Sequence, residues 1–362
     1  MISASNALQM RLRKLGVDAV LFNTSEHLPS INLRYLSGFT GSDASLLITA
    51  HEMRLFTDGR YKSQAAREAP GFRLHVTRQK MESLARILAR LKVKRLGIES
   101  ARVSYEFVKA LERKSPGVRI VDMKRSFVEE LRIRKSPEEK RKIQEAAAIA
   151  SRCCQEILER GLDGRTEIEV ADELEMLFKR HRAQGRAFET IVASGERSAW
   201  PHGTATEKTI RKGELVIVDY GCVVGGYNSD ETVTCVVGRP TREQQKIYTA
   251  AHTAHMKAIE ALKIGVSVKT VDRVARDAIQ KAGYGKHFLH GLGHGLGLEV
   301  HEPPRLSPLG RGVIDEGMVF TIEPGIYLEG VGGVRLESLI YMDRDGPEVL
   351  SRMPKELIRI EP

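Results

Sequence analysis

The sequence predicts a two-domain protein of the α+β class, in which an α/β domain precedes a larger domain of helices and antiparallel hairpins. Three observations lead to this prediction. The chain has 362 residues, which is more than one typical domain needs. Short apolar runs alternate with helical patterns over residues 1–125, and capped helices with hairpin patterns follow from residue 136. We therefore expect domains at 1–125 and 136–362, joined by a linker at 126–135.

The first domain contains six short apolar runs with the composition of β-strands. They are Asp18–Phe22, Ser45–Thr49, Arg54–Thr57, Phe72–Val76, Arg95–Ile98 and Arg119–Val121. Apolar residues at helical spacing predict an amphipathic helix over Met81–Lys92. The polar stretches Ser37–Asp43 and Thr57–Arg60 are expected to be loops, and they hold no convergent pattern of ligands or nucleophiles.

The second domain opens with strong helix-start signals. Ser136–Glu139 combines a serine cap, a proline at the first helical position and a glutamate at the third. Two further capping boxes begin at threonines. The predicted elements are helices from Pro137, over Thr166–Ala183, Thr241–Leu262 and Val268–Ala282, and a strand over Phe188–Ser194.

The segment Val216–Asp230 predicts a β-hairpin with one acidic residue in each arm. A turn centred on Val224–Gly225 would place Asp219 directly opposite Asp230, with about 5 Å between the two Cβ atoms. Like charges that face each other across a ladder destabilise a sheet, and buried carboxylates are costly unless they are paired or metal-bound. Such a pair points to a nearby cation.

The segment Val319–Glu337 repeats this pattern, with Glu323 and Glu337 symmetric about Gly330. Arg335 is the only basic residue near the two hairpins, so the four carboxylates lack compensating charge. We predict two similar halves, each built from helices and a hairpin, that face each other. The four carboxylates would form a metal site between them.

Three histidines, His290, His294 and His301, lie within twelve positions between the two hairpins, and His202 precedes the first one. Glycines alternate through His290–His301, which argues against a helix and favours an extended strand. His290 and His294 would then lie on one face of that strand. Their position between the acidic hairpins predicts a functional role.

The metal site should prefer a hard cation. Carboxylates and imidazoles without thiolates suit Mn²⁺ best, with Co²⁺, Fe²⁺ or Zn²⁺ as alternatives. Four carboxylates over-neutralise one dication, so two divalent metal ions fit better than one. A dinuclear centre generates a hydroxide nucleophile and polarises a carbonyl or phosphoryl oxygen. The residues alone leave hydrolysis of a peptide, an amide or a phosphate ester open.

Composition excludes several other classes. The net charge is +10, but the Lys and Arg residues are spread over predicted helices without interleaved aromatic residues. We expect a solvated basic surface with no nucleic-acid partner and no membrane partner. The four cysteines lack the CxxC spacing of metal ligands and are expected to be core residues in a reducing compartment. The start of the chain does not resemble a signal peptide, so we expect a cytoplasmic location.

The sequence resembles the methionine aminopeptidase, aminopeptidase P and prolidase group. The order and spacing of five residues match the metal ligands of that group, namely Asp219, Asp230, His294, Glu323 and Glu337. The segments GERSAWPHG (195–203), GHGLGLEVHEP (293–303) and IEPGIY (322–327) are similar to its signatures. RYLSGFTGSDASLLIT and LFTDGRY resemble the creatinase-like N-terminal domain of the Xaa-Pro branch. The resemblance covers nearly the whole chain and implies a pita-bread catalytic domain.

The resemblance also implies a role for each ligand. Asp219 would chelate one metal ion, and Asp230 and Glu337 would bridge both ions. His294 and Glu323 would complete the coordination of the other ion. Glu323 would in addition accept the proton of the bridging water.

Other residues are implied to act on the substrate. His202, His290 and His301 match histidines that bind the substrate and steady the tetrahedral intermediate. Arg335 lies two residues before Glu337 on the same strand face, so it would orient that carboxylate or meet a carboxylate of the substrate.

The implied activity is that of a metallopeptidase that removes the N-terminal residue of peptides with proline at the second position, an Xaa-Pro aminopeptidase. The alternative is an Xaa-Pro dipeptidase (prolidase), and the first-domain motifs favour the aminopeptidase. A remote alternative is a pita-bread protein that only binds a partner, but such relatives lose ligands and this sequence keeps all five. A creatinase-like amide hydrolase works without metal and is disfavoured for the same reason. The resemblance further implies a homodimer.

The chain departs from the group's pattern after Asp230. Glu231 stands where an apolar residue is usual, and Val233 stands where an arginine is usual. The missing arginine puts in doubt an ion pair behind the ligands and leaves the metal ligands themselves intact. Ser338 also replaces a common acidic residue, whereas Thr232 keeps the position that faces the site.

Overall fold

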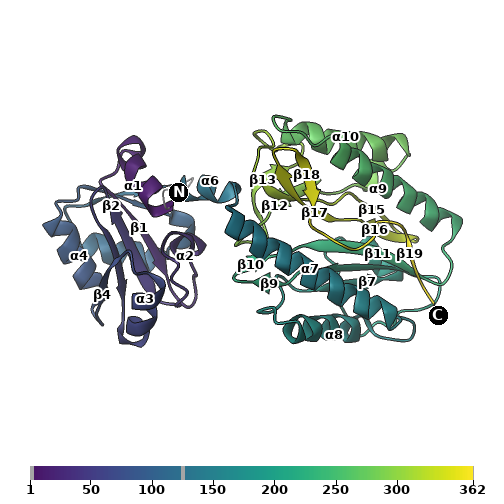
Figure 1. The fold of residues 1–362 in the computed structure, drawn as a ribbon, viewed down its shortest axis with the longest axis horizontal. Coiled ribbons are helices and arrows are strands. Elements are labelled where there is room, and N and C mark those ends of the chain that lie inside the picture. Colours follow the sequence, from purple (N-terminus) through teal and green to yellow (C-terminus); the bar gives the residue numbers. More distant parts are fainter. Residues whose placement is uncertain (1–3, 124–126, 362) are drawn as a thin grey trace. The chain divides into compact units, whose positions relative to one another are not determined.

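The computed structural model describes residues 4–123 and 127–361, which divide between Leu131 and Arg132 into two compact units. Helices and strands occur in both units, so the predicted α+β class is confirmed (Figure 1). The helix α6 (Phe127–Ile133) occupies most of the segment that the sequence predicts as a linker.

The first unit is built on one six-stranded sheet with the order β4-β3-β2-β1-β5-β6. Its strands are β1 (Ala19–Thr24), β2 (Ala44–Thr49), β3 (Met53–Thr57), β4 (Arg73–Val76), β5 (Arg95–Ile98) and β6 (Arg119–Asp122). The strand β2 runs antiparallel to β1 and β3, and the other neighbouring pairs are parallel. All six predicted strands are present, with ends that differ by one or two residues.

Helices cover both faces of this sheet. They are α1 (Ala4–Leu15), α2 (Ile31–Ser37), α3 (Lys62–Glu68), α4 (Lys80–Arg90) and α5 (Tyr105–Lys114). The buried side chains of α1, α2 and α3 pack in one core on one face, and those of α4 and α5 pack in a second core on the other face. The predicted helix over Met81–Lys92 corresponds to α4, and the unit is an α/β sandwich.

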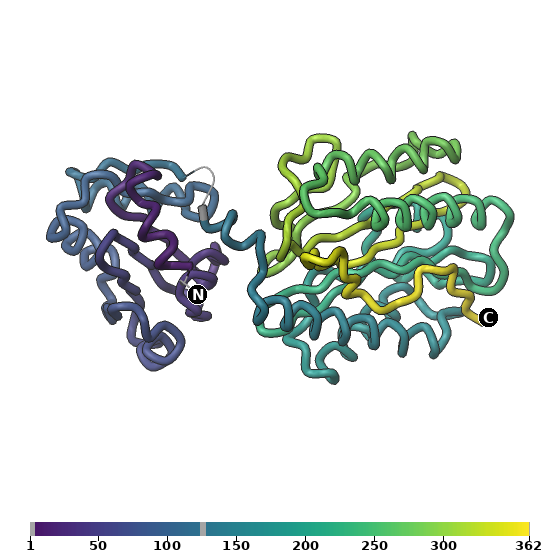
Figure 2. The backbone as a smooth tube through the Cα atoms, turned by 45° about the horizontal axis from the view of Figure 1, so that its top comes forward, coloured from purple at the N-terminus to yellow at the C-terminus, as the bar shows by residue number. Residues whose placement is uncertain are grey.

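Four long helices shape the second unit, namely α7 (Pro137–Glu159), α8 (Glu167–Arg180), α9 (Arg242–Glu260) and α10 (Val268–Lys281). The first three start at the predicted capping boxes. The pair α7 and α8 packs on one side of the strands, and the pair α9 and α10 packs on the other side (Figures 1 and 2). This repetition of a helix pair confirms the predicted two-half organisation.

Each helix pair covers its own sheet. A four-stranded sheet has the order β19-β11-β8-β7. Its strands are β7 (Ile191–Ser194), β8 (Leu215–Tyr220), β11 (Glu231–Val237) and β19 (Ile358–Ile360). A five-stranded sheet has the order β13-β12-β14-β17-β18. Its strands are β12 (Gly293–Gly295), β13 (Glu302–Leu306), β14 (Val319–Ile322), β17 (Ser338–Asp343) and β18 (Gly346–Val349).

The first acidic hairpin differs from its predicted register. Thr232 lies opposite Asp219, and the small ladder of β9 (Val223–Val224) and β10 (Tyr227–Asn228) continues the same register. The turn is therefore centred one position later, on two glycines with φ of 56° and 83°. A tight hairpin turn with positive φ at both central residues favours two glycines there. The prediction that Asp219 faces Asp230 directly was wrong, although the two share one face of the hairpin.

The second acidic hairpin has the predicted register. In the ladder of β15 (Gly325–Leu328) and β16 (Gly332–Arg335), the first residue of one strand pairs with the last residue of the other. This ladder is symmetric about Gly330, so Glu323 and Glu337 occupy equivalent positions just beyond its open end.

Backbone and threonine hydrogen bonds join the two hairpins. Thr234 Oγ1 donates to the Arg335 carbonyl over 2.8 Å and accepts from the Arg335 N–H over 3.0 Å. The Glu337 N–H donates to the Thr232 carbonyl over 3.0 Å. The arms that carry acidic residues in the two halves of the unit therefore lie side by side.

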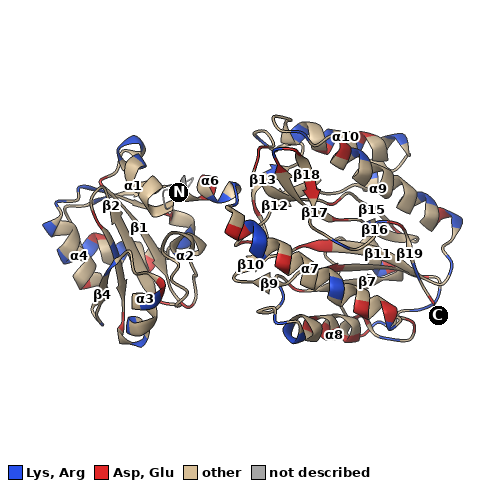
Figure 3. Cartoon of the chain, viewed as in Figure 1, with Lys and Arg blue, Asp and Glu red and all other residues tan. Residues whose placement is uncertain are grey.

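All four cysteines are buried and free, as the sequence predicts for core residues. Among the residues that the structure describes, no helix is long and apolar enough to cross a membrane. The charged residues lie mainly on helices and connecting segments (Figure 3).

Candidate metal centre

A cavity of about 640 Å³ opens in the second unit between the two acidic hairpins. Its lining includes all nine residues that the sequence predicts for the site. They are Asp219, Asp230, His294, Glu323, Glu337, His202, His290, His301 and Arg335. The fold therefore brings together side chains that lie far apart along the chain.

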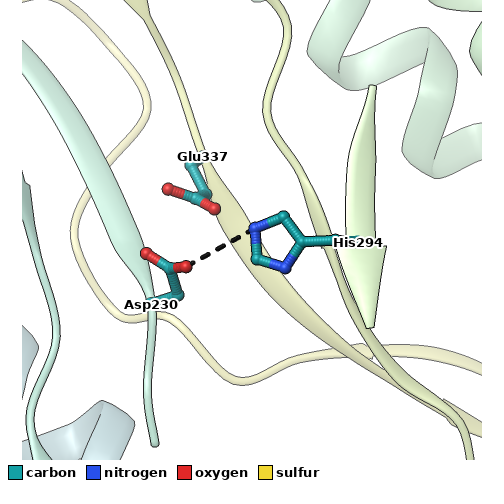
Figure 4. Close-up of side chains that lie close together, drawn as sticks. All are labelled: Asp230, His294 and Glu337. Atoms are coloured by element: carbon teal, nitrogen blue, oxygen red, sulfur yellow. Dashed lines mark ion pairs between the residues drawn. The ribbon is translucent and has the colours of Figure 1, made fainter. Parts of the chain in front are cut away.

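Three of these side chains form the tightest group. Asp230, His294 and Glu337 each offer one ligand atom, and these atoms lie within 4.8 Å of one another. Figure 4 shows the imidazole of His294 pointing between the two carboxylates. His294 Nε2 lies 3.6 Å from Asp230 Oδ2. The short strand β12 supplies the histidine, and the acidic residues come from the starts of β11 and β17.

Glu323 lies on the other side of this histidine. Its Oε1 lies 3.3 Å from His294 Nε2 and accepts a hydrogen bond from Thr321 Oγ1 over 3.2 Å. The Glu323 N–H donates to the carbonyl of Leu292 over 2.8 Å, which ties the end of β14 to the segment before β12. Glu323 is therefore held in place from both its backbone and its side chain.

Only one of the two carboxylate oxygens of Asp219 has a hydrogen-bond partner among the described residues. Its Oδ2 accepts from Arg335 Nη2 over 2.6 Å, whereas its buried Oδ1 has no hydrogen-bond partner among the described residues. Arg335 also donates to Tyr327 Oη over 2.8 Å and to Thr232 Oγ1 over 3.3 Å. The guanidinium pairs with Asp219, and it reaches Glu337 only through Thr232, whose Oγ1 accepts from Arg335 Nε and donates to Glu337 Oε2.

The protonation of His294 suits a metal ligand. Its Nδ1 lies 3.1 Å from the Gly295 carbonyl, so this nitrogen carries the proton and Nε2 presents a lone pair to the acidic group. Burial, followed by the neighbouring His301, lowers the pKa of His294 to about 3. The imidazole is therefore neutral at pH 7.

The carboxylates repel one another strongly when no cation is present. Burial, followed by the charge of Glu337, raises the pKa of Asp230 and of Glu323 well above the usual range. Burial and the charge of Asp219 raise the pKa of Glu337 to about 8. Crowded buried carboxylates with one unpartnered oxygen and an available imidazole nitrogen fit hard divalent cations.

The remaining histidines surround this group. His290 Nε2 lies 2.9 Å from Tyr327 Oη, and burial lowers the pKa of His290 to about 4. His301 is exposed, and its ring centre lies 4.2 Å from that of His294. His202 is exposed at the rim of the cavity. The predicted extended conformation is present at His294, whereas His290 lies outside any strand.

Five polar residues line the cavity without having been predicted from the sequence, namely Glu189, Thr204, Arg305, Ser307 and Tyr327. Tyr327 links Arg335 to His290 by hydrogen bonds. Because Tyr327 follows Glu323 by four residues in an extended chain, the spacing could have indicated that both side chains lie on the same face. Arg305 also lines the cavity, is exposed, and makes no ion pair with any described residue. Because Arg305 pairs with His294 across the ladder of β12 and β13, its side chain shares a sheet face with the histidine.

The unusual residues after Asp230 lie on the opposite face of β11. The carboxylate of Glu231 is buried and accepts from Ser151 Oγ at 2.5 Å, Tyr220 Oη at 3.0 Å and Lys355 Nζ at 2.7 Å. Thr232 faces the site as predicted, and its Oγ1 donates to Glu337 Oε2 over 2.7 Å.

Two family descriptions match the chain. The description "Metallopeptidase family M24" matches residues 141–344, and "Creatinase/Prolidase N-terminal domain" matches residues 5–134. An Xaa-Pro dipeptidase of Pyrococcus horikoshii is 38% identical over 349 residues, which cover 95% of each chain.

Solved structures show the same likeness. The Xaa-Pro dipeptidase from Bacillus anthracis is similar with a TM-score of 0.94 and 36% identity, covering 98% of this chain and 99% of its own. The X-Pro aminopeptidase from Thermotoga maritima has a TM-score of 0.90 and 35% identity, covering 97% of this chain and 100% of its own.

Proposed function

This chain belongs to metallopeptidase family M24, and we propose that it hydrolyses Xaa-Pro dipeptides. It is a metallo-exopeptidase with a creatinase-type first unit and a pita-bread second unit. Membership of the family implies divalent metal ions. The sequence favoured the aminopeptidase activity, but the names of the similar proteins favour the dipeptidase. The similar structure from Thermotoga maritima is named an X-Pro aminopeptidase, so that activity is the second candidate.

We propose that the five predicted ligands hold two divalent ions, of which Mn²⁺ suits the oxygen-rich donor set best. Three observations support this assignment: the raised pKa values of the acidic residues, the unpartnered Oδ1 of Asp219, and the lone pair of His294 Nε2. When bound, such ions lower the pKa of a water molecule and polarise the carbonyl of the scissile amide.

The protein's own groups would position the substrate and move protons. Glu323 is the proposed proton acceptor, because its carboxylate lines the cavity 3.3 Å from His294 Nε2 and accepts a hydrogen bond from Thr321 Oγ1 over 3.2 Å. His202 and His301, which are exposed at the cavity, are proposed to bind the peptide. His290 is proposed to act with Tyr327, since their hydrogen bond also fixes the guanidinium beside Asp219.

Arg305 gives a second argument for a dipeptide substrate, besides the names of the similar proteins. In an Xaa-Pro dipeptide the proline carries a free carboxylate close to the scissile bond, so the site needs a cation near the metal ligands. Arg335 is already engaged by Asp219, Tyr327 and other acceptors, whereas Arg305 is available on the same face as His294. A guanidinium binds a carboxylate in a bidentate manner.

The proposal predicts that the manganese-loaded enzyme cleaves Ala-Pro with a higher kcat/KM than Ala-Pro-Ala or Ala-Pro-amide. The variant Arg305→Gln should raise the KM for Ala-Pro roughly tenfold to a hundredfold, because it removes a charged hydrogen bond to the carboxylate. Steady-state kinetics with the three substrates would measure both effects.

The matched control is Arg311→Gln, because Arg311 is also exposed but lies outside the cavity lining. This control should leave all three KM values unchanged. Faster cleavage of Ala-Pro-Ala would favour the aminopeptidase, and no turnover of any substrate would refute both candidates.

A further inference from the structure

The net positive charge of the chain belongs entirely to the first unit. Residues 1–131 contain 23 Lys and Arg against 13 Asp and Glu, whereas residues 132–362 contain 34 of each kind. The chain's net charge of +10 is therefore the charge of the first unit alone. A charge asymmetry of this kind between parts of a chain is typical of proteins with an anionic partner.

Much of this charge gathers at one edge of the six-stranded sheet. All strands except β2 start at the same edge, and α1, α4 and α5 end there because each leads into one of those strands. Ten exposed cations lie at these strand starts and helix ends, and we call them the basic edge. They are Arg13, Lys14, Arg73, Arg90, Lys92, Lys94, Arg95, Arg113, Lys114 and Arg119.

Backbone contacts confirm that these elements meet at the edge. The Arg119 N–H donates to the Lys94 carbonyl over 2.7 Å, which joins the start of β6 to the start of β5. Arg95 Nε donates to the Gly16 carbonyl over 2.6 Å, which joins β5 to the turn after α1. The cations of α1, β5 and β6 are therefore neighbours across the sheet.

The basic edge is not neutralised by its own acidic residues. Asp18 accepts from the backbone N–H groups of Lys94 and Arg95, each over 2.8 Å. Among the described residues, Lys114 is the one member of the basic edge within ion-pair distance of a carboxylate, that of Glu82 at 3.3 Å. The other nine exposed cations thus have no carboxylate within ion-pair distance among the described residues, and their mutual repulsion costs free energy.

The shape and chemistry of the edge select the class of partner. Six strands spaced about 4.8 Å apart make a row roughly 24 Å long, which matches the phosphates along roughly seven base pairs. The large exposed hydrophobic residues described in the first unit lie in the middle of α1, at the far end of β4 and at the start of α5, so they are away from the edge. Membrane insertion and stacking on single strands both rely on such side chains.

We infer that the basic edge binds the phosphate backbone of double-helical nucleic acid without reading its sequence. The sequence predicted a solvated basic surface because the Lys and Arg residues are spread over helices, whereas the structure places ten of them along one edge of the first unit. The lack of aromatic residues among the cations argues against stacking on single-stranded nucleic acid. It does not argue against contact with the phosphate backbone of a duplex. This binding is separate from the peptidase site, which lies wholly in the second unit.

The test is fluorescence anisotropy of the full metal-loaded protein with labelled DNA and RNA duplexes of mixed sequence. Binding should be similar for different sequences and should weaken with salt between about 50 and 200 mM KCl, with a log–log slope of about −4. The variant Lys94→Gln/Arg119→Gln removes two cations whose side chains make no ion pair. This double variant should weaken binding roughly tenfold at low salt and reduce the slope by about 2.

The matched control is Lys62→Gln/Arg78→Gln, which removes two exposed cations near the opposite edge of the same unit. It should leave the salt slope unchanged, and both double variants should keep the wild-type peptidase rate. Three outcomes would overturn the inference: no duplex binding at low salt, an equal effect of the two double variants, or binding to anionic lipid vesicles in preference to duplexes.

Discussion

Residues 230–234 alternate between two environments, and this alternation separates catalysis from packing. Asp230, Thr232 and Thr234 point toward the proposed metal ligands and the second hairpin. Glu231 and Val233 point into the layer beneath α7 and α8, where Val233 belongs to the apolar core. The departures from the group's pattern at these two positions therefore change the packing face and leave the ligand face intact.

At the residue scale we expect Asp230→Asn to abolish metal binding with little effect on the fold. The amide keeps the shape of the side chain but removes a negative charge that the metal ions need. Peptidase activity should fall by several orders of magnitude. In chelator, the thermal midpoint should stay equal or rise, because the mutation relieves repulsion with Glu337.

Metal analysis of the purified proteins and thermal melts with and without Mn²⁺ would measure both effects, since a ligand that binds only the native state raises the midpoint. The control is Asp277→Asn, because Asp277 is exposed on α10 and makes no ion pair with described residues. An Asp230→Asn protein with the metal content and rate of the wild type would show that this carboxylate is not a ligand.

The sequence predicted four of the five acidic residues of the cavity, all but Glu189, because each hairpin shows its carboxylates at recognisable positions around a turn. Arg305 and Tyr327 were missed for a physical reason. Arg305 reaches the cavity through its pairing with His294, and that pairing depends on which strands of the sheet become neighbours. Local patterns of polarity do not encode such long-range register.

At the element scale, local signals predicted the elements that carry their own capping chemistry. The starts of α7, α8 and α9 follow from side chains that satisfy free backbone N–H groups within three residues. In the first unit the helices α1, α2, α3 and α5 were not predicted individually, and for the seven-residue α2 and α3 the reason is that two turns are too short for a clear apolar period. The first hairpin turn was misplaced by one residue, since both centres keep the same alternation of apolar side chains.

The contact between α9 and β17 makes the fold sensitive to acid. His255 on α9 is buried, its Nε2 lies 3.0 Å from Ser338 Oγ, and its Nδ1 has no partner among the described residues. Burial, followed by the nearby charges of Lys355 and His252, lowers the pKa of His255 to about 3. Below pH 6.5 the unfolded chain gains a proton that the folded protein does not take up, so this group reduces stability as the pH falls.

We therefore expect His255→Gln to weaken the acid dependence of unfolding. Between pH 7 and pH 5 the wild type should lose about 2 kcal/mol more of its free energy of unfolding than the variant does. Urea unfolding in the presence of chelator at the two pH values would measure the difference. His252→Gln, on the same helix but partly exposed, is the control and should keep the wild-type dependence; an equal pH dependence in His255→Gln and the wild type would contradict the assignment.

At the scale of the whole molecule, composition predicted much of the architecture but not the strand order. The alternation of apolar runs and helices predicted a sheet covered by helices in the first unit. The central place of β1 between β2 and β5 could not be predicted, because it depends on a crossover between strands far apart in the sequence. The gathering of positive charge at one edge of the first unit was not predicted either, because it depends on which helix ends and strand starts become neighbours.

We also expect the protein to form a homodimer, as its resemblance to the Xaa-Pro branch implies. Light scattering coupled to size exclusion should return a mass of about twice the 40.4 kDa of one chain. The measurement should be made at several micromolar concentrations, because a dimer in exchange with its monomer would shift with dilution. A constant mass equal to that of one chain would refute the expectation.

Because the site joins two hairpins that are distant in the sequence, its residues are synthesised at different times. Asp230 and Glu337 are separated by 107 positions in the chain. At a synthesis rate of about 5–20 residues per second, roughly 5–20 s pass between the emergence of the first acidic hairpin and that of the last carboxylate. During this interval the growing chain offers an incomplete set of donors to every cation around it. The full set of proposed ligands therefore exists only after both hairpins have been made, so we expect metal loading to follow the synthesis of Glu337.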